Sequence, residues 1–191
     1  MTDTIGVRQA GVERNHDALL AAASAAFVEQ GVQAPVRDIA QRAGVGVGTV
    51  YRHFPTRAEL VTAVYRHQLN ECAALAPRLL QEPLAPTIAL SRWIDAFVEF
   101  LVTKHGLGMA LQSEDTSLYS LHTLMLDKLV PACASLLDAG VTAGEIDPRV
   151  RAYTLMRAVG NLCILGSHYG RSDAKDMIAR LLVGCRQGES A

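Results

Sequence analysis

The chain has 191 residues, of which 50% are hydrophobic and 5% aromatic, and its formal net charge is −1. This length suits one large domain or a small head on a larger body. Alanine and leucine dominate the apolar residues, which favours an all-α fold because strands prefer β-branched and aromatic side chains. The chain has no apolar signal segment and no uncharged apolar run of about 18 residues, so we expect a cytoplasmic protein without membrane contact.

Enzyme and metal motifs are missing from the sequence. The four cysteines are scattered singly, so we expect reduced, buried thiols and no metal site; they are Cys72, Cys133, Cys163 and Cys185. A P-loop, a dinucleotide-binding fingerprint and an HExxH motif are also absent. The sequence therefore predicts no catalytic residue and no cofactor.

The N-terminal third has the pattern of a three-helix head that contains a helix-turn-helix. Residues 1–12 lack periodicity and are expected to form a flexible arm. A helix is expected from about Glu13 to Gln30, a second from Pro35 to about Ala43, and a third from Val47 to His53. A glycine follows each of the first two helices, as a stop signal. Residues 13–54 would then form the helix-turn-helix.

The third of these helices carries the candidate DNA-binding residues, because the second helix of a helix-turn-helix enters the major groove. Thr49 and Val47 can meet base edges or thymine methyl groups, and Gly48 lets the backbone come close. Tyr51 and His53 have the reach to bond phosphates. The outward positions of this helix are Val47, Gly48, Thr49, Tyr51, Arg52 and His53.

A connecting helix, expected over residues 55–77, opens with a capping box formed by Thr56 and Glu59. Arg57 lies at the same helix N-terminus, where free N–H groups favour a phosphate, and Arg37 is expected on the same side of the turn. Between residues 36 and 67, five arginines oppose two acidic residues, which gives a local charge of 5 − 2 = +3. This excess suits contact with nucleic acid.

The segment AFVEQGVQAPVRDIAQRAGVGVGTVYRHFPTRAELV resembles the N-terminal domain of TetR-type transcriptional regulators, over about Asn15 to Tyr65. The resemblance implies a homodimer of subunits with about nine helices. Its two heads would bind a palindromic operator in double-stranded DNA, and its bodies would dimerise and often bind an effector. The residues that match the DNA-contacting pattern of the family are Thr49, Tyr51, His53 and Arg57, with Arg37 as a base reader.

The chain departs from the family pattern at three places. Ala34, Pro35 and Val36 stand where the family often has Ser or Thr, so a hydroxyl contact to phosphate is lost. Gly46 replaces a frequent capping Ser, which costs only a few tenths of a kcal/mol. Val47 replaces a position that is often polar, so the operator sequence of relatives does not transfer to this chain.

Residues 78–191 are expected to form a larger helical bundle. Pro131 should kink one of its long helices and could open a cavity there. The last helix would be capped by Ser172 or Asp173. The helices before it are expected over Thr87 to Lys104, Leu118 to Leu137, and the stretch from an Asp147-Pro148 cap to about Leu165, with a short helix near Met109.

Several side chains of this bundle are candidates for an effector site or a dimer interface. Polar groups within apolar stripes either bond to one another or contact a ligand. For a small apolar or amphipathic effector, the candidates are Trp93, Phe97, His122, Met125, Tyr153, Arg157 and Asn161. The resemblance implies a dimer interface on the last two helices, or the same stripes form intramolecular core; these candidates are Leu155, Val159, Leu162, Ile178, Leu181 and Leu182.

The helix-turn-helix predicts a DNA-binding regulator, and the resemblance implies a homodimeric repressor that a small-molecule effector releases from a palindromic operator. A DNA-binding regulator without a ligand, whose body only dimerises, is the alternative. An all-α enzyme or cofactor carrier is a third possibility, but the motifs that it would need are absent.

Overall fold

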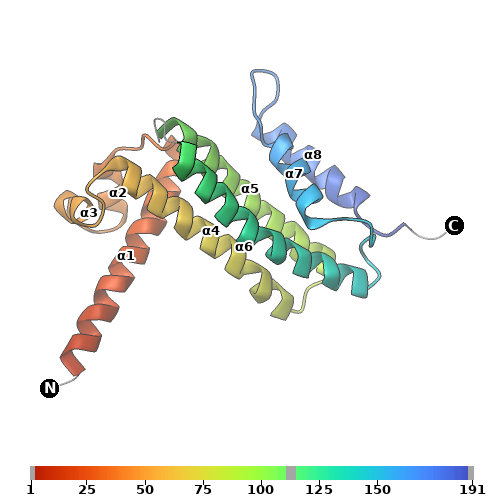
Figure 1. Cartoon of the computed structure of the whole chain (residues 1–191), viewed down its shortest axis with the longest axis horizontal. Coiled ribbons are helices and arrows are strands. Elements are labelled where there is room, and N and C mark those ends of the chain that lie inside the picture. Colours follow the sequence, from red (N-terminus) through yellow and green to blue (C-terminus); the bar gives the residue numbers. More distant parts are fainter. Residues whose placement is uncertain (1–2, 111–114, 189–191) are drawn as a thin grey trace. The chain divides into compact units, whose positions relative to one another are not determined.

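The computed structural model describes residues 3–110 and 115–188, and the side chains of residues 16–101 and 121–188. The described residues form eight helices and no strand, which confirms the predicted all-α fold with a helix count close to nine (Figure 1). The helices are α1 (Asp3–Gln30), α2 (Val36–Arg42), α3 (Val47–His53), α4 (Arg57–Gln81), α5 (Pro86–Ala110), α6 (Asp115–Thr142), α7 (Ala152–Leu162) and α8 (Arg171–Gly184).

The chain divides into two compact units, and the boundaries fall inside helices α4 and α5. The first unit comprises Met1–Gln68 with Thr103–Glu114, and the second comprises Leu69–Val102 with Asp115–Ala191. The first unit therefore holds α1 to α3 and the first half of α4. The second holds the end of α4, most of α5, and α6 to α8.

The core of the first unit follows from the helical spacing of apolar residues. Leu20, Ala23 and Phe27 recur at helical spacing on α1, with Leu19 alongside, and all four are buried. The other helices of the unit also bury apolar residues, namely Ile39 and Ala40 of α2, Val50 of α3, and Leu60, Val61 and Val64 of α4. Helix α2 packs on α1, and α3 packs on α2 (Figure 1).

Two glycines end the first two helices, as predicted. Gly31 has a φ of 79° and Gly44 a φ of 66°, a region that favours glycine. After α2, the N–H of Gly44 donates to Gln41 O at 3.2 Å and the N–H of Val45 donates to Ala40 O at 3.0 Å. These two bonds form a Schellman motif, which turns the chain sharply into α3.

Helix α1 begins at Asp3, earlier than the predicted start near Glu13. The predicted flexible arm over residues 1–12 therefore differs from the structure, in which residues 3–12 are helical. Extending a helix that already exists adds one hydrogen bond for each residue fixed. The two glycines in this stretch cost only about 1 kcal/mol each, too little to end the helix by themselves.

The capping box at the start of α4 is confirmed. The backbone N–H of Thr56 donates to Glu59 Oε2 at 3.1 Å, and the N–H of Glu59 donates to Thr56 Oγ1 at 3.2 Å. Each side chain satisfies an amide that the helix itself cannot bond. The box fixes where α4 starts after the turn that follows α3.

We expect Thr56→Ala to lower the free energy of unfolding by about 1 kcal/mol, because the N–H of Glu59 loses its partner. Urea denaturation followed by circular dichroism measures this change. Thr56→Ser is the matched control, since it keeps the hydroxyl and should retain most of the stability. Equal unfolding midpoints for the alanine variant and the original protein would contradict a role for this cap.

The second unit corrects two predicted helix ends. Helix α4 runs through Pro77 to Gln81 rather than stopping at Pro77. Ala76 and Leu79 on either side are buried, so packing outweighs the hydrogen bond that proline removes. Helix α5 likewise continues through its two late glycines to Ala110 and includes Met109, near which the sequence predicts a separate helix.

The predicted caps of the last two helices are also corrected. Asp147 does not cap α7, because its carboxylate accepts from the backbone N–H of Arg149 at 2.8 Å and forms a turn. The Arg149 guanidinium also bonds this carboxylate, and these bonds lower the pKa of Asp147 to about 2. Helix α7 therefore starts at Ala152. Asp173 lies inside α8, where its carboxylate accepts from the N–H of Gly170 at 2.7 Å.

The core of the second unit centres on Trp93 of α5, which is fully buried. Its indole Nε1–H donates to Cys72 O at 2.9 Å, which satisfies the only polar atom of the side chain. Its ring stacks on Phe97 with centroids 5.6 Å apart. Leu129 and Leu136 of α6 are also fully buried, and Pro131 lies between them inside the helix.

The four cysteines are free and buried, as predicted. Burial raises the pKa of Cys72 and Cys133 to about 12, and it also raises the pKa of Cys163 and Cys185. A thiol with a raised pKa carries little reactive thiolate near neutral pH, so these side chains behave as small apolar residues. None of the helices in the described ranges combines the length and apolar character that crossing a bilayer requires.

Candidate nucleic-acid interface

Helix α3 presents most of its surface outward, because Val50 is its only buried residue. The side chain of Tyr51 is 52% exposed and that of Val47 39% exposed. Gly48 and Arg52 are also exposed. A seven-residue helix fixed to its unit through one core residue presents a free face of the size that a major groove admits.

Thr49 and Arg52 form a linked pair on this face. Arg52 Nη2 donates to Thr49 Oγ1 at 3.1 Å, across one turn of the helix. Thr49 is half-buried, so its hydroxyl lies at the foot of the exposed surface. The bond holds the guanidinium close to the helix, where both groups can meet the edge of a base.

His53 is held in place by ring contacts. It is half-buried, and its ring centroid lies 5.6 Å from that of His16 on α1 and 6.2 Å from that of Phe54. The sequence predicts a phosphate contact for His53 but gives no sign of its packing against His16. Residues 37 positions apart meet only through the tertiary fold, since 53 − 16 = 37.

Arg37 and Arg42 contribute differently to the positive charge of this region. Arg37 is exposed in the first turn of α2. Arg42 instead pairs with Glu29 of α1, through bonds of 3.0 and 2.5 Å from its two terminal nitrogens to the two carboxylate oxygens. The bond from Arg42 lowers the pKa of Glu29. Part of the local +3 charge is therefore neutralised within the unit, while Arg37 remains available to a partner.

Arg57 has internal partners that the sequence did not predict. Its Nε donates to Val32 O at 2.9 Å, and its Nη2 donates to Ala34 O at 2.7 Å and also to Val32 O. Its guanidinium lies over the Phe27 ring, 5.1 Å from the centroid. Burial lowers the pKa of this guanidinium. Arg57 thus ties the start of α4 to the connection between α1 and α2.

The fold of the chain itself does not require glycine at position 48. A Cβ built at this position would meet no atom within 4 Å, and its φ is not positive. Glycine inside a helix costs about 0.5–1 kcal/mol relative to alanine. The free space therefore lies on the outer face of α3, where a ligand backbone can approach.

The candidate effector residues are not gathered at one place. Trp93, Phe97 and Met125 are buried in the core of the second unit. The polar candidates, which the sequence places within apolar stripes, are instead exposed: His122, Arg157 and Asn161. Tyr153 is 46% exposed. The exposure of these four corrects the prediction that they lie inside the bundle.

The burial of the candidate dimer residues corrects the predicted dimer interface in part. Leu155 and Val159 of α7 and Ile178 of α8 are buried in the core of their own unit. Leu162, Leu181 and Leu182 are half-buried. Both faces of α7 carry apolar residues, and the structure turns the Leu155 face inward. The face with Tyr153 and Arg157 is therefore the outward one.

The family model for bacterial regulatory proteins of the tetR family matches residues 19–64. The chain is 30% identical over 99 residues to the HTH-type transcriptional repressor KstR2 of Mycolicibacterium smegmatis, and the match covers 51% of this chain and 48% of that protein. It is 35% identical over 130 residues to the HTH-type transcriptional repressor Rv3405c of Mycobacterium tuberculosis, which covers 68% and 60%. The chain thus spans about half the length of the first relative.

Similarity to a solved structure extends over nearly the whole chain. The structure of the TetR transcriptional regulator SCO0520 from Streptomyces coelicolor superposes with a TM-score of 0.73 at 31% sequence identity. The match covers 91% of this chain and 99% of that one. The similarity therefore includes the C-terminal helices as well as the helix-turn-helix.

Proposed function

Because this chain belongs to the TetR family of bacterial transcriptional regulators, we propose that it acts in the cytoplasm as a homodimeric repressor. Two copies of α3 would enter successive major grooves of a palindromic operator, about 34–36 Å apart. A small-molecule effector would release the protein from the DNA by binding better to a form whose spacing does not fit. Two relatives are named transcriptional repressors, which supports repression rather than activation.

The observation that carries the proposal is the outer face of α3. It combines the exposed Tyr51 and Arg52 with Thr49, which is hydrogen-bonded to Arg52. It also contains Gly48, where the described structure leaves room for a side chain. Base edges, a thymine methyl group and the phosphate backbone are the partners that this set of groups fits. Arg37 on α2 would add a further contact.

We expect Gly48→Ala to move stability and DNA binding in opposite directions. Alanine should raise the free energy of unfolding by about 0.5–1 kcal/mol, because it favours the helix. The added methyl group should weaken operator binding, because it holds α3 away from the groove. Urea denaturation and fluorescence anisotropy with a labelled duplex measure the two effects.

Gly46→Ala is the matched control, because a Cβ at Gly46 also meets nothing within 4 Å but this residue caps α3 instead of lying within it. We expect it to affect DNA binding less than Gly48→Ala does. Operator affinity unchanged by Gly48→Ala would contradict the close approach of α3 to DNA.

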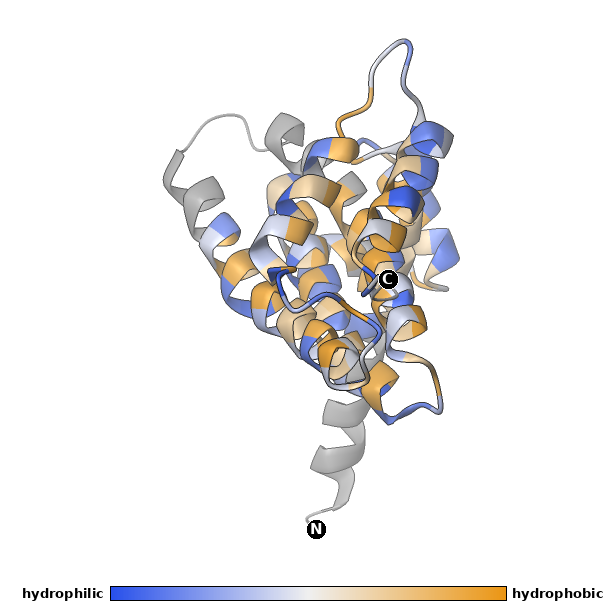
Figure 2. Ribbon diagram, turned by 90° about the vertical axis from the view of Figure 1, so that its right-hand side faces the viewer, coloured by the Kyte–Doolittle hydropathy of each residue, from blue (hydrophilic) through white to orange (hydrophobic). Residues whose placement is uncertain are grey.

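The dimer would form through the outward faces of α7 and α8. Large apolar side chains are exposed on these helices and on the connection between them: Tyr153 of α7 is 46% exposed, Ile164 and Leu165 of the connection 63% and 49%, and Met177 of α8 45%. Figure 2 shows that the connection between the two helices begins with an apolar stretch. Exposed apolar residues grouped on neighbouring elements are typical of protein interfaces.

We expect Met177→Glu to shift the protein from dimer to monomer, because a carboxylate would be desolvated at the interface. Sedimentation velocity at micromolar concentration measures the shift. Ile88→Glu is the matched control: Ile88 is similarly exposed, at 47%, but lies on α5. A monomeric original protein, or equal shifts in both variants, would contradict a dimer through α7 and α8.

A regulator without a ligand is the second candidate. The buried positions of Trp93, Phe97 and Met125 favour it, since these side chains fill core rather than line a cavity. The two candidates share the same DNA contacts and differ only in whether an effector changes operator affinity.

A further inference from the structure

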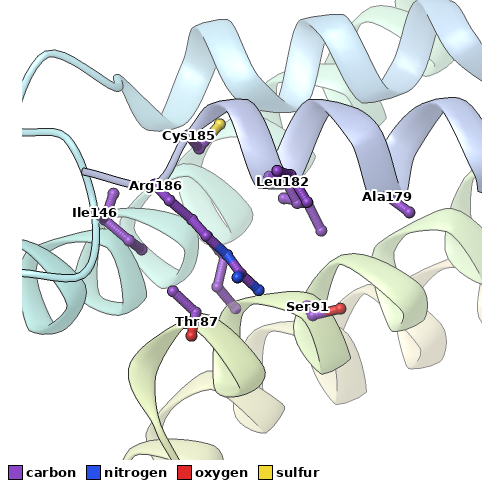
Figure 3. A pocket seen from close by; sticks show the side chains of 9 residues that line it. Thr87, Ser91, Ile146, Ala179, Leu182, Cys185 and Arg186 are labelled. Atoms are coloured by element: carbon purple, nitrogen blue, oxygen red, sulfur yellow. The ribbon is translucent and has the colours of Figure 1, made fainter. Parts of the chain in front are cut away.

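A pocket of about 210 Å³ lies in the second unit, and none of the predicted effector residues lines it. It is enclosed by the start of α5, the end of α8 and the segment that follows α6 (Figure 3). Leu90, Ile146 and Leu182 give it apolar walls, while Thr87 and Ser91 add hydroxyl groups. Residues from three distant segments form it, so no local pattern in the sequence could have indicated it.

Arg186 supplies the one positive charge among the lining residues. Figure 3 shows its side chain reaching across the pocket from the end of α8, with the guanidinium toward Thr87 and Ser91 on α5. Within the described part of the chain, no ion pair or side-chain hydrogen bond involves this guanidinium. The group is therefore open to an anionic partner.

Backbone hydrogen bonds fix the main chain at Arg186 and so position the base of its side chain. Residues Ile146 and Arg186 form an antiparallel bridge. On either side of it, the N–H of Asp147 donates to Cys185 O at 3.0 Å and the N–H of Gln187 donates to Glu145 O at 3.0 Å. These bonds tie the end of α8 to the segment that follows α6.

The two acidic side chains on this segment, Glu145 and Asp147, already have partners, and Asp147 pairs with Arg149. Glu145 Oε2 accepts from the backbone N–H of Thr87 at 3.0 Å and from its hydroxyl at 2.8 Å. The Glu145 carboxylate thus caps the N-terminus of α5 and is not paired with Arg186. An incoming carboxylate would meet the guanidinium without displacing an existing ion pair.

From this arrangement we propose that the pocket binds a short-chain aliphatic carboxylate. Arg186 would hold the carboxylate through two parallel N–H bonds. The Ser91 hydroxyl also lines the pocket, on the side toward which the guanidinium points, and would add a third bond. The aliphatic chain would lie against Leu90, Ile146 and Leu182. A volume of about 210 Å³ is below the roughly 300–1,000 Å³ of sites for drug-sized ligands, so a short acid of about four to six carbons suits it.

Binding of such an acid would also affect operator binding, an inference that rests on the proposed function. The pocket separates α5 from α8, and α8 belongs to the proposed dimer face. A ligand between these helices would favour one position of α8 and so one spacing of the two subunits. The binding step itself does not depend on the dimer or on DNA.

Isothermal titration calorimetry of the full chain with hexanoate tests the binding step. Hexanamide has the same chain without the charge, and we expect it to bind at least tenfold more weakly. Butyrate should also bind more weakly than hexanoate, by about fourfold for each methylene removed. No heat with millimolar hexanoate, or equal affinity for hexanoate and hexanamide, would overturn the proposal.

Arg186→Gln should weaken hexanoate binding at least tenfold, while Arg180→Gln should leave it unchanged, since Arg180 is an exposed arginine of α8 outside the pocket. Ser91→Leu fills the pocket without touching the charge and should also abolish binding. Thermal melts identify any variant that does not fold. Equal loss in both arginine variants would point to a general charge effect and overturn the assignment.

Operator affinity without any acid separates this proposal from the proposed function. If the original protein and Arg186→Gln bind operator alike but hexanoate does not bind, the pocket assignment alone fails. If no duplex is bound, the proposed function fails whatever the calorimetry shows. Hexanoate should lower operator affinity at least fivefold in the original protein, and an unchanged affinity would overturn the regulatory role of the pocket.

Discussion

Replacing Arg57 with alanine is expected to lower the free energy of unfolding by about 2–4 kcal/mol, because hydrogen bonds from a charged donor are each worth about 1.5–3 kcal/mol. The variant leaves the carbonyls of Val32 and Ala34, both in buried residues, without the donors that they have now. It also removes the contact over Phe27. Against a typical total of about 5–15 kcal/mol, this is a large loss.

The same variant distinguishes a structural role from a phosphate contact. Urea denaturation gives the stability, and operator binding across a salt series gives the number of phosphate contacts. Arg57→Lys should recover part of the stability, since an ammonium group can reach one carbonyl but not make the same set of bonds. Arg37→Ala is the matched control: it should lose operator affinity at unchanged stability, because Arg37 is exposed.

If Arg57→Ala unfolds like the original protein while its salt slope falls by about 1.8, which is about 0.9 for one phosphate contact in each subunit of the dimer, Arg57 contacts a phosphate, as the sequence alone suggested. That result would contradict the role that the carbonyl bonds indicate. If the variant is less stable but its folded fraction keeps the salt slope of operator binding, the result would support a structural role for Arg57.

Replacing Thr49 with alanine is expected to change which operator sequences are preferred. The hydroxyl and methyl groups of Thr49 lie at the foot of the exposed face of α3, and the hydroxyl holds Arg52 at 3.1 Å. Losing a base contact costs about 1–3 kcal/mol at one position of each half-site, which is about 5- to 150-fold in relative affinity. Removing the hydroxyl also frees Arg52 to take another base or a phosphate.

Binding of a library of operator variants measures this change position by position. Thr49→Ser keeps the hydroxyl and removes only the methyl group, so a preference lost in both variants identifies the methyl contact. Arg52→Gln, alone and combined with Thr49→Ala, gives the coupling between the two side chains. Relative affinities that stay the same across the library would contradict a base-reading role for Thr49.

The helix-turn-helix could be predicted closely because its signals are local. The predicted bounds of α3 match the structure, and the glycines at 31 and 44 end α1 and α2 where the sequence places their stops. The capping box of Thr56 and Glu59 needs only residues three positions apart. Short-range hydrogen bonds and helical spacing are readable from a sequence without knowledge of the rest of the fold.

The second unit was harder to predict because both faces of its helices carry apolar residues. For α7, the spacing allowed either the Leu155 face or the Tyr153 face to lie inward, and tertiary packing chose the first. The bonds from Arg57 to the loop before α2, and the pocket around Arg186, join residues far apart in the sequence. Such contacts exist only once the chain is folded, so no motif indicates them.

Selection of duplexes from a random library by the purified protein, at moderate ionic strength, tests the central claim most directly. If two copies of α3 read neighbouring major grooves, the enriched sequences will contain an inverted repeat whose half-site centres lie about 10 base pairs apart or a whole number of helical turns. A library with no enriched sequence, or one with isolated half-sites bound by a single subunit, would contradict the account.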